Sequence, residues 1–369
     1  MSVNKSFRNF TYKTTDLKGQ NGKPDHLHPH IEKQIGKFKK KNPPADVFVR
    51  EILQGNKAWL SRAITLVEST APDDRHLASE IIRRLLPHSG NSFRIGITGV
   101  PGVGKSTFID RLGTAYIHKG HKVAVLAIDP SSAINKGSIL GDKTRMENLI
   151  KEENAFIRPS PAGNFLGGVA RKTRESIILC EAAGYDRILV ETVGVGQSEI
   201  YVRYITDMFL LLKLPGAGDE LQGIKRGIME MADMIIINKA DRLMKEEARK
   251  AVNIFKNALQ YFTFRDTNNI DVMAVSSFSS ADIQRVLEKI EHFRDKLIRS
   301  GQWENQRREQ LIFWFEEGLL ELFKNRFRSD KELLHEKTRL AEAVKQKKIT
   351  PFEAAETLWA LFLDKLKKE

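Results

Sequence analysis

The fold of this chain is decided by the stretch Gly99-Val100-Pro101-Gly102-Val103-Gly104-Lys105-Ser106. It follows an apolar run at 94–98 that predicts a strand, and it precedes a predicted helix. Glycines leave such a loop free to wrap a polyphosphate, with backbone N–H groups and the helix N-terminus directed at the anion. Lys105 would neutralise the outer phosphates, and Ser106 would place its hydroxyl beside a bridging Mg²⁺ ion. The expected phosphate-binding residues are Gly99, Val100, Pro101, Gly102, Val103, Gly104, Lys105, Ser106 and Thr107.

Outward from this loop, short apolar runs alternate with amphipathic helical patterns across residues 91–280. This alternation predicts an α/β fold, a P-loop domain with a mostly parallel, doubly wound sheet covered on both faces. A helical segment is expected before it at 44–90, and a helical region after it at 281–369. The expected strands are 94–98, 122–128, 186–191, 208–214, 233–238 and 271–275.

A second motif, Asn238-Lys239-Ala240-Asp241, follows an expected strand at its carboxyl end, where ligands bind in such sheets. Asp241 can accept hydrogen bonds from N1–H and the exocyclic amine of guanine, while the Lys239 stem covers the ring and Asn238 ties the loop. Adenine offers an acceptor at N1 and would leave the carboxylate unpaired. The motif therefore favours GTP over ATP. Ser276 and Ser277, after another expected strand, are candidates for a backbone contact to the guanine carbonyl.

Three acidic residues between the two motifs stand out, each at or just past an expected strand or in the loop that follows it: Asp129, Asp142 and Glu191. Phosphoryl transfer needs carboxylates to hold Mg²⁺, a group that orients water and a positive charge near the γ-phosphate. All three acids are candidates to face the metal, and Gly194 can place an N–H on the γ-phosphate. For Asp129 and Asp142, helix capping or surface charge is the alternative.

The net charge of +13 is unevenly distributed over the 369 residues. Residues 1–41 hold ten lysines and arginines against three acids, a surplus of seven. Because residues 1–43 are also polar and end in two prolines, we expect a solvated, poorly ordered tail, with binding to an acidic partner as the alternative. Nucleic acid is a less favoured partner.

No apolar run approaches the roughly 20 residues that a membrane span needs, and no apolar leader opens the chain. Cys180 is the single cysteine, so an internal disulfide is excluded. A cytoplasmic protein without a membrane partner is expected. The short basic start faintly resembles an organelle transit peptide, which is the alternative.

Beyond residue 281 the apolar spacing is helical. Residues 311–327 are apolar around much of the helix circumference, which favours a homodimer interface over an ordinary packed helix. Thr350, Pro351 and Glu353 then have the pattern of a capped helix start.

Together these stretches resemble the MeaB/ArgK family of P-loop GTPases, which chaperone adenosylcobalamin-dependent acyl-CoA mutases such as methylmalonyl-CoA mutase. The resemblance spans about residues 46–369 and is carried by 99–106, 123–132, 137–146, 191–199 and 218–225. It implies a homodimer that uses Mg²⁺ and GTP/GDP to gate cofactor delivery to the mutase or to protect it.

The resemblance also implies residue roles. The magnesium shell would be Ser106, Asp129, Asp142 and Glu191, with 142–145 as a mobile switch near the phosphates. An additional switch loop at 214–225 would respond to the mutase. With Lys105, the catalytic candidates are therefore Asp142, Arg145, Glu191, Asp219 and Lys225, the last of them acting like an arginine finger.

Two loops depart from the family pattern. Asn135 and Lys136 stand where the family usually has a threonine and a glycine, and 162–164 replace the usual serine and arginine. The sequence leaves three alternatives: a nickel or zinc metallochaperone GTPase, which would need more cysteines; an ATP-dependent kinase linked to amino-acid transport; and a nucleotide-regulated binding switch with negligible turnover.

Overall fold

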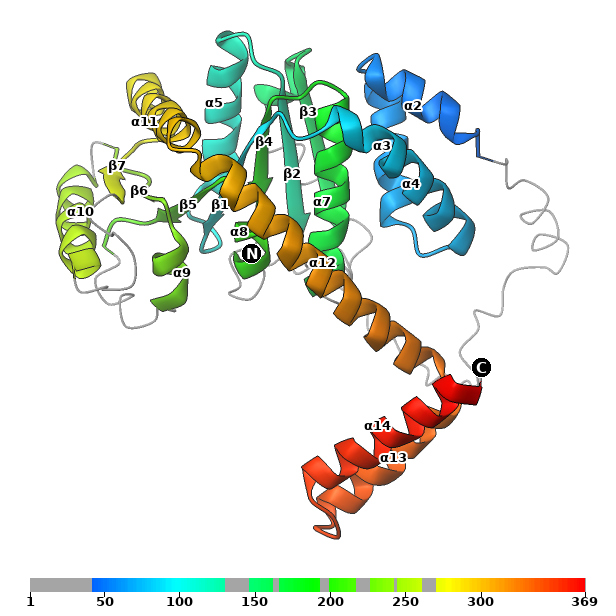
Figure 1. Cartoon of the computed structure of the whole chain (residues 1–369). Coiled ribbons are helices and arrows are strands. Elements are labelled where there is room, and N and C mark those ends of the chain that lie inside the picture. The colour runs from blue at the N-terminus through cyan, green and yellow to red at the C-terminus, as the bar shows by residue number, and fades with distance from the viewer. Residues whose placement is uncertain are drawn as a thin grey trace, which may run out of the picture. The chain divides into compact units, whose positions relative to one another are not determined.

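The computed structural model of the chain describes residues 42–129, 146–161, 166–192, 199–216, 226–241, 244–260 and 270–368 (Figure 1). At 128–129, 160–161, 166–170, 199–200, 226 and 368 it describes the backbone alone. The chain divides into two units, Met1–Pro43 and Pro44–Glu369. Disorder was expected for the basic tail at 1–43, of which residues 1–41 lie outside the described ranges.

A parallel sheet forms the centre of the fold. Within the described residues it has seven strands in the order β3-β2-β4-β1-β5-β6-β7, and every neighbouring pair is parallel. The predicted α/β class is therefore confirmed. The strands are β1 (Phe93–Gly99), β2 (Val123–Asp129), β3 (Ala155–Pro161), β4 (Arg187–Glu191), β5 (Met208–Lys213), β6 (Met234–Ile237) and β7 (Asp271–Ala274).

Strand β3 is the strand that the sequence analysis missed. It contains Pro159 and Pro161, and proline has no backbone N–H to donate. A central strand hydrogen-bonds to a neighbour on each side, so prolines argue against a strand in that position. In the structure β3 pairs with β2 at one edge of the sheet, with Ala127 opposite Pro159. An edge strand tolerates proline because one of its two sides makes no ladder with another strand.

Helices cover both faces of the sheet (Figure 1). On one face, α5 (Lys105–His118) and α11 (Ser280–Arg299) share an apolar cluster with β1 and β5. The opposite face packs against α7 (Leu166–Ala182), α8 (Glu199–Arg203), α9 (Arg226–Met231) and α10 (Lys245–Gln260). Among the described residues there are also two short 3-10 turns, η1 (Leu86–His88) and η3 (Leu149–Lys151). Both faces of the sheet are therefore buried, as its apolar strands require.

Three helices precede the sheet, in the stretch where helices were expected: α2 (Ala45–Leu53), α3 (Lys57–Glu68) and α4 (Pro72–Leu85). They pack on α7 and extend the same apolar cluster. Lys172 Nζ of α7 donates to the carbonyl of Glu68 at 2.8 Å, and Arg158 of β3 forms an ion pair with the Glu68 carboxylate. The three helices are thus fastened to the β3 side of the sheet.

The amino ends of β1 and β5 hold a group of charges, which we call the amino-edge cluster: the buried Arg94, Glu181 and Asp207 and the half-buried Arg307. Asp207 is fully buried and accepts from the Arg307 guanidinium at 2.5 and 2.7 Å, from Arg94 N at 2.8 Å and from Trp303 Nε1 at 3.0 Å. Glu181 binds the Arg94 guanidinium at 2.7 Å. Burial lowers the pKa of Arg94, and the two carboxylates oppose that effect.

The amino-edge cluster fastens the start of α12 (Gln302–Ser329) to the sheet. Further along α12, Gln310 Nε2 donates to the Thr206 carbonyl at 2.7 Å, and Trp314 Nε1 donates to the Tyr204 carbonyl at 2.8 Å. Beyond Trp314 the helix continues toward α13 (Lys331–Lys345) and α14 (Pro351–Lys368), which pair with each other (Figure 1).

The expected capped start of the last helix is present. Thr350 N donates to Glu353 Oε2 at 2.8 Å, and Glu353 N donates to Thr350 Oγ1 at 3.2 Å, which forms a reciprocal capping box. Across the described ranges, no helix combines the length and the apolar content that crossing a bilayer requires.

Candidate functional site

The predicted phosphate loop lies between β1 and α5, at the carboxyl edge of the sheet. Gly104 precedes α5 with a φ of 95°, and a Cβ there would lie 2.8 Å from the Asn238 amide nitrogen, so the position requires glycine. Lys105 Nζ donates to the carbonyls of Gly99 at 2.8 Å and Val100 at 3.3 Å, which holds the ammonium over the loop. Of the other predicted residues, Val103 is buried, Pro101 and Gly102 are exposed, and Thr107 lies half-buried in the first turn of α5.

Beside this loop, Ser106 Oγ donates to Glu191 Oε1 at 3.1 Å. Glu191 ends β4, whose register places it opposite Ile97 of β1. Thr192, the next residue, is tied to β1 by its N–H to the Ile97 carbonyl at 3.0 Å and by its hydroxyl to Thr98 Oγ1 at 2.7 Å. A hydroxyl oxygen next to a carboxylate oxygen is a donor set that suits Mg²⁺.

The other candidates for the metal and the γ-phosphate are only partly described. Asp129 ends β2, which neighbours β4, so its backbone lies at the same edge of the sheet. The structure describes the backbone of Asp129 but not its side chain. Asp142, Arg145 and Gly194 lie outside the described residues, as do Asp219 and Lys225 and the departures at 135–136 and 162–164.

The predicted base-reading loop is bonded directly to the phosphate loop. Asn238 is 1% exposed; its Nδ2 donates to the Val103 carbonyl at 2.8 Å, and its Oδ1 accepts from Ser277 Oγ at 2.7 Å. Ala240 N donates to the Val275 carbonyl at 3.1 Å. Lys239, at φ 59°, and Asp241 keep exposed side chains. The two motifs, far apart in sequence, therefore meet at one edge of the sheet.

A tight turn at 276–279 completes this edge. Ser279 N donates to the Ser276 carbonyl at 2.9 Å, and Ser276 N donates to Asp282 Oδ2 at 3.0 Å. Since Asp282 binds the Ser276 amide, a backbone contact from this turn to guanine would come from Ser277 or the residue after it. Ser279 Oγ caps α11 by accepting from Asp282 N at 3.2 Å.

Sequence reasoning missed two acids that position these loops. One is Asp282; the Ser279-x-x-Asp282 spacing of a capping box was its signal. The other is Asp110 of α5, which is 4% exposed and accepts from Asn148 N at 3.1 Å and Leu149 N at 2.8 Å. Asp110 thereby anchors the residues that follow the predicted switch at 142–145.

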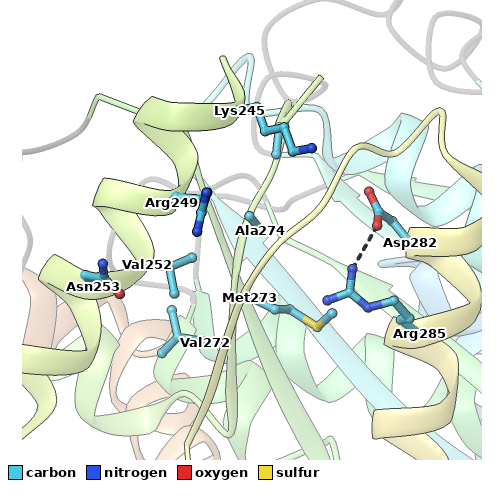
Figure 2. Close-up of a pocket in the computed structure, with 10 residues that line it drawn as sticks. Lys245, Arg249, Val252, Asn253, Val272, Met273, Ala274, Asp282 and Arg285 are labelled. Carbon is cyan, nitrogen blue, oxygen red and sulfur yellow. Dashed lines mark hydrogen bonds and ion pairs between the residues drawn. The ribbon is translucent and has the colours of Figure 1, made fainter. Parts of the chain in front are cut away.

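A cavity of about 410 Å³ lies along the outer side of β7, between α10 and α11. Figure 2 shows Lys245 and Arg249 of α10 on one side and Arg285, paired with Asp282, on the other. The lining includes Ala240 but neither the phosphate loop nor Asp241. It therefore neighbours the base-reading loop without forming the predicted nucleotide site.

Comparison with known proteins identifies the family. The family model described as "Methylmalonyl Co-A mutase-associated GTPase MeaB" matches residues 60–332. A "Probable GTPase" of Mycobacterium tuberculosis is 46% identical over 305 residues, which cover 82% of this chain and 91% of the relative. "GTPase ArgK" of Escherichia coli is 44% identical over 283 residues, covering 75% and 86%.

Among solved structures, a crystal structure of "LAO/AO transport system kinase" aligns with a TM-score of 0.71 at 33% identity, over 86% of this chain and 97% of that one. The resemblance read from the motifs is thus confirmed by sequence and by fold. This chain belongs to the MeaB family.

Proposed function

We propose that this chain binds and hydrolyses GTP with Mg²⁺ and acts as a chaperone of an adenosylcobalamin-dependent acyl-CoA mutase of the methylmalonyl-CoA mutase type, gating cofactor delivery or protecting the mutase. The GTPase part is supported by the names of its relatives and the mutase part by the description of its family.

The observation that carries the nucleotide assignment is the hydrogen bond from Asn238 Nδ2 to the Val103 carbonyl, at 2.8 Å. It joins the loop that would read the base to the loop that would hold the phosphates. A nucleotide that bound one loop would therefore find the other already placed, which lowers the entropic cost of binding.

In this proposal each residue of the site has a chemical task. The phosphate-loop amides and Lys105 bind the phosphates, and Ser106 and Glu191 supply oxygen ligands for Mg²⁺, together with Asp129 and Asp142. The metal, when bound, neutralises charge that develops on the phosphate oxygens. Asp241 selects guanine by accepting from its N1–H and amine.

Asp219, Lys225 and Arg145 keep, as proposals, the roles that the family resemblance implies. Lys225 would bring a positive charge to the γ-phosphate when the mutase docks, and Asp219 would help to couple that movement to the partner. Gly194 would donate its N–H to the γ-phosphate.

We also propose that the chain works as a homodimer in the cytoplasm. Seven large apolar side chains of α12 are between 44% and 68% exposed. Their helical spacing places them along one side of the helix, where apolar residues are ordinarily buried. An apolar stripe of this kind is typical of an interface. Its members are Leu311, Ile312, Phe315, Leu319, Leu320, Leu322 and Phe323.

Phosphate release from GTP, measured with and without purified methylmalonyl-CoA mutase, tests the main proposal. We expect hydrolysis of GTP, acceleration by the mutase, and loss of that acceleration in Lys225→Ala. Lys245→Ala, which removes an exposed lysine of α10, is the matched control. A preference for ATP would favour a kinase of the type named for the structural neighbour, and tight GTP binding without any turnover would favour a simple switch.

The dimer has its own test. Phe315→Glu combined with Leu322→Glu should convert the protein to a monomer in sedimentation, whereas Glu316→Gln on the same helix should not. A double variant that sediments like the wild type would exclude this surface.

The metallochaperone alternative is disfavoured by the single cysteine. Cys180 is fully buried in α7, and burial, reinforced by the neighbouring Glu181, raises the pKa of its thiol well above the usual range. A thiol held protonated inside the fold does not serve as a metal ligand. Within the described ranges, no three histidine, cysteine or acidic side chains gather as a metal site.

A further inference from the structure

One aromatic side chain, that of Phe278, is exposed at the carboxyl edge of the sheet. Phe278 is 74% exposed, at the third position of the 276–279 turn. Single exposed apolar residues are common on protein surfaces, so exposure alone carries little meaning. The position of this ring is what matters, because it stands on the loop that adjoins the predicted base reader.

Three hydrogen bonds hold the turn that carries Phe278 in place. Asp282 Oδ2 holds the Ser276 amide, Ser279 N closes the turn onto the Ser276 carbonyl, and Ser277 Oγ donates to Asn238 Oδ1. The strand end just before the turn also accepts Ala240 N. Phe278 and the Lys239–Asp241 loop are therefore held beside each other by hydrogen bonds from buried or half-buried groups.

Guanine bound at this edge presents two faces and one hydrogen-bonding rim. Asp241 would engage the rim, and the aliphatic stem of Lys239 would cover one face. The second face needs a flat, apolar partner, and an aromatic ring is the side chain that stacks best on a base. Phe278 is the exposed aromatic residue on the adjoining turn.

We propose that the Phe278 ring covers the face of the guanine base opposite Lys239, so that the base is held between the two side chains. This inference rests on the proposed GTP site and adds a binding residue to it. The exposed ring loses its contact with water when the nucleotide binds, and the base is shielded on both faces.

In this arrangement Phe278 and Asp241 have separate roles in binding the base. Stacking depends on the ring system and is insensitive to the pattern of donors and acceptors on the rim. Phe278 therefore sets how tightly a purine is held, whereas Asp241 sets which purine is preferred. Loss of Phe278 should weaken GDP and inosine diphosphate to a similar degree.

Titration calorimetry with GDP and inosine diphosphate tests these separate roles. In Phe278→Ala we expect the Kd for both nucleotides to rise about five- to a hundredfold, with their ratio unchanged. Phe278→Tyr should bind as the wild type does, because it keeps the ring. The matched control is Phe352→Ala, which removes a phenylalanine that is 82% exposed on α14 and should leave both Kd values unchanged.

A second variant makes the contact visible. In Phe278→Trp, stacking on guanine should quench the fluorescence of the new indole on adding GDP, measured against the wild type with its four tryptophans. Wild-type affinity in Phe278→Ala, or no additional quenching in Phe278→Trp, would overturn the stacking role while leaving the GTP site intact. If the wild type itself bound no GDP, the proposed function would fail instead.

Discussion

The two edges of the sheet use the same kinds of charged residue in opposite ways. At the amino edge, Asp207 and Glu181 are buried, and arginine, indole and backbone groups donate to them. At the carboxyl edge, Lys239 and Asp241 keep exposed side chains on a loop that backbone and amide hydrogen bonds hold in place. Charges that the fold itself satisfies hold the chain together, whereas charges presented on fixed loops are available to a ligand.

The two edges should respond in opposite ways to substitution. Substitutions at the amino edge should change the free energy of unfolding and leave nucleotide binding alone. Substitutions at the carboxyl edge should do the reverse. Four variants, ordered from the largest expected effect to the smallest, test whether the separation holds.

Asp207→Asn should have the largest effect. It removes the negative charge that faces Arg307 and leaves buried donors poorly matched, so the free energy of unfolding should fall by about 3–5 kcal/mol in urea titrations. Glu246→Gln, which breaks an exposed pair with Arg249, should cost less than about 1 kcal/mol. Equal stability of Asp207→Asn and the wild type would show that the amino-edge cluster does not hold the fold.

Lys105→Ala should impair GTP hydrolysis and leave the free energy of unfolding nearly unchanged. Without the ammonium beside the phosphates, the rate of GTP hydrolysis should fall about a hundred- to a thousandfold, as measured by phosphate release. The urea midpoint should move little, because the lysine is only half-buried. Full activity of this variant would remove the phosphate loop from the proposed mechanism.

Asp241→Asn should change selectivity more than rate. Asparagine can donate to the C2 carbonyl of xanthine but no longer accepts both guanine donors, so the preference for GTP over XTP should fall about ten- to a hundredfold. Competition between the two nucleotides measures this ratio directly. An unchanged preference would contradict the guanine assignment of the loop.

Gln310→Leu should have the smallest effect. It removes the donor at 2.7 Å from the Thr206 carbonyl, which keeps a second donor in Gln306 Nε2 at 3.1 Å, so the free energy of unfolding should fall by only about 0.5–1.5 kcal/mol. Nucleotide affinity, measured in the same preparation, should stay at the wild-type value. A change in affinity instead would show that α12 communicates with the nucleotide site, and the separation of the two edges would be incomplete.

The sequence predicted the carboxyl edge far better than the amino edge, for a physical reason. Phosphate binding needs glycines, a lysine and a hydroxyl in consecutive positions, so 99–106 can be recognised without a structure. The amino-edge cluster joins Arg94 of β1, Glu181 of α7, Asp207 just before β5 and Arg307 of α12, which are far apart in the sequence. No spacing rule relates such residues before the chain folds.

The same reasoning explains the smaller misses. The prolines of β3 argue against a strand unless its edge position is known, and sheet order is a property of the whole fold. Asp110 and Asp282 look like ordinary helix residues until the backbone amides that they accept from are placed beside them. Local chemistry was predictable, and contacts between distant segments were not.

The single thiol of Cys180 has a practical consequence for studying this protein. Because its only cysteine is fully buried and held protonated, the folded chain should resist maleimides and other thiol reagents. A cysteine introduced at the surface would then be the one site that such a reagent modifies quickly. Spin labels or fluorophores could be attached to a chosen loop without first removing a native residue, and delayed labelling of Cys180 itself would report how often α7 opens.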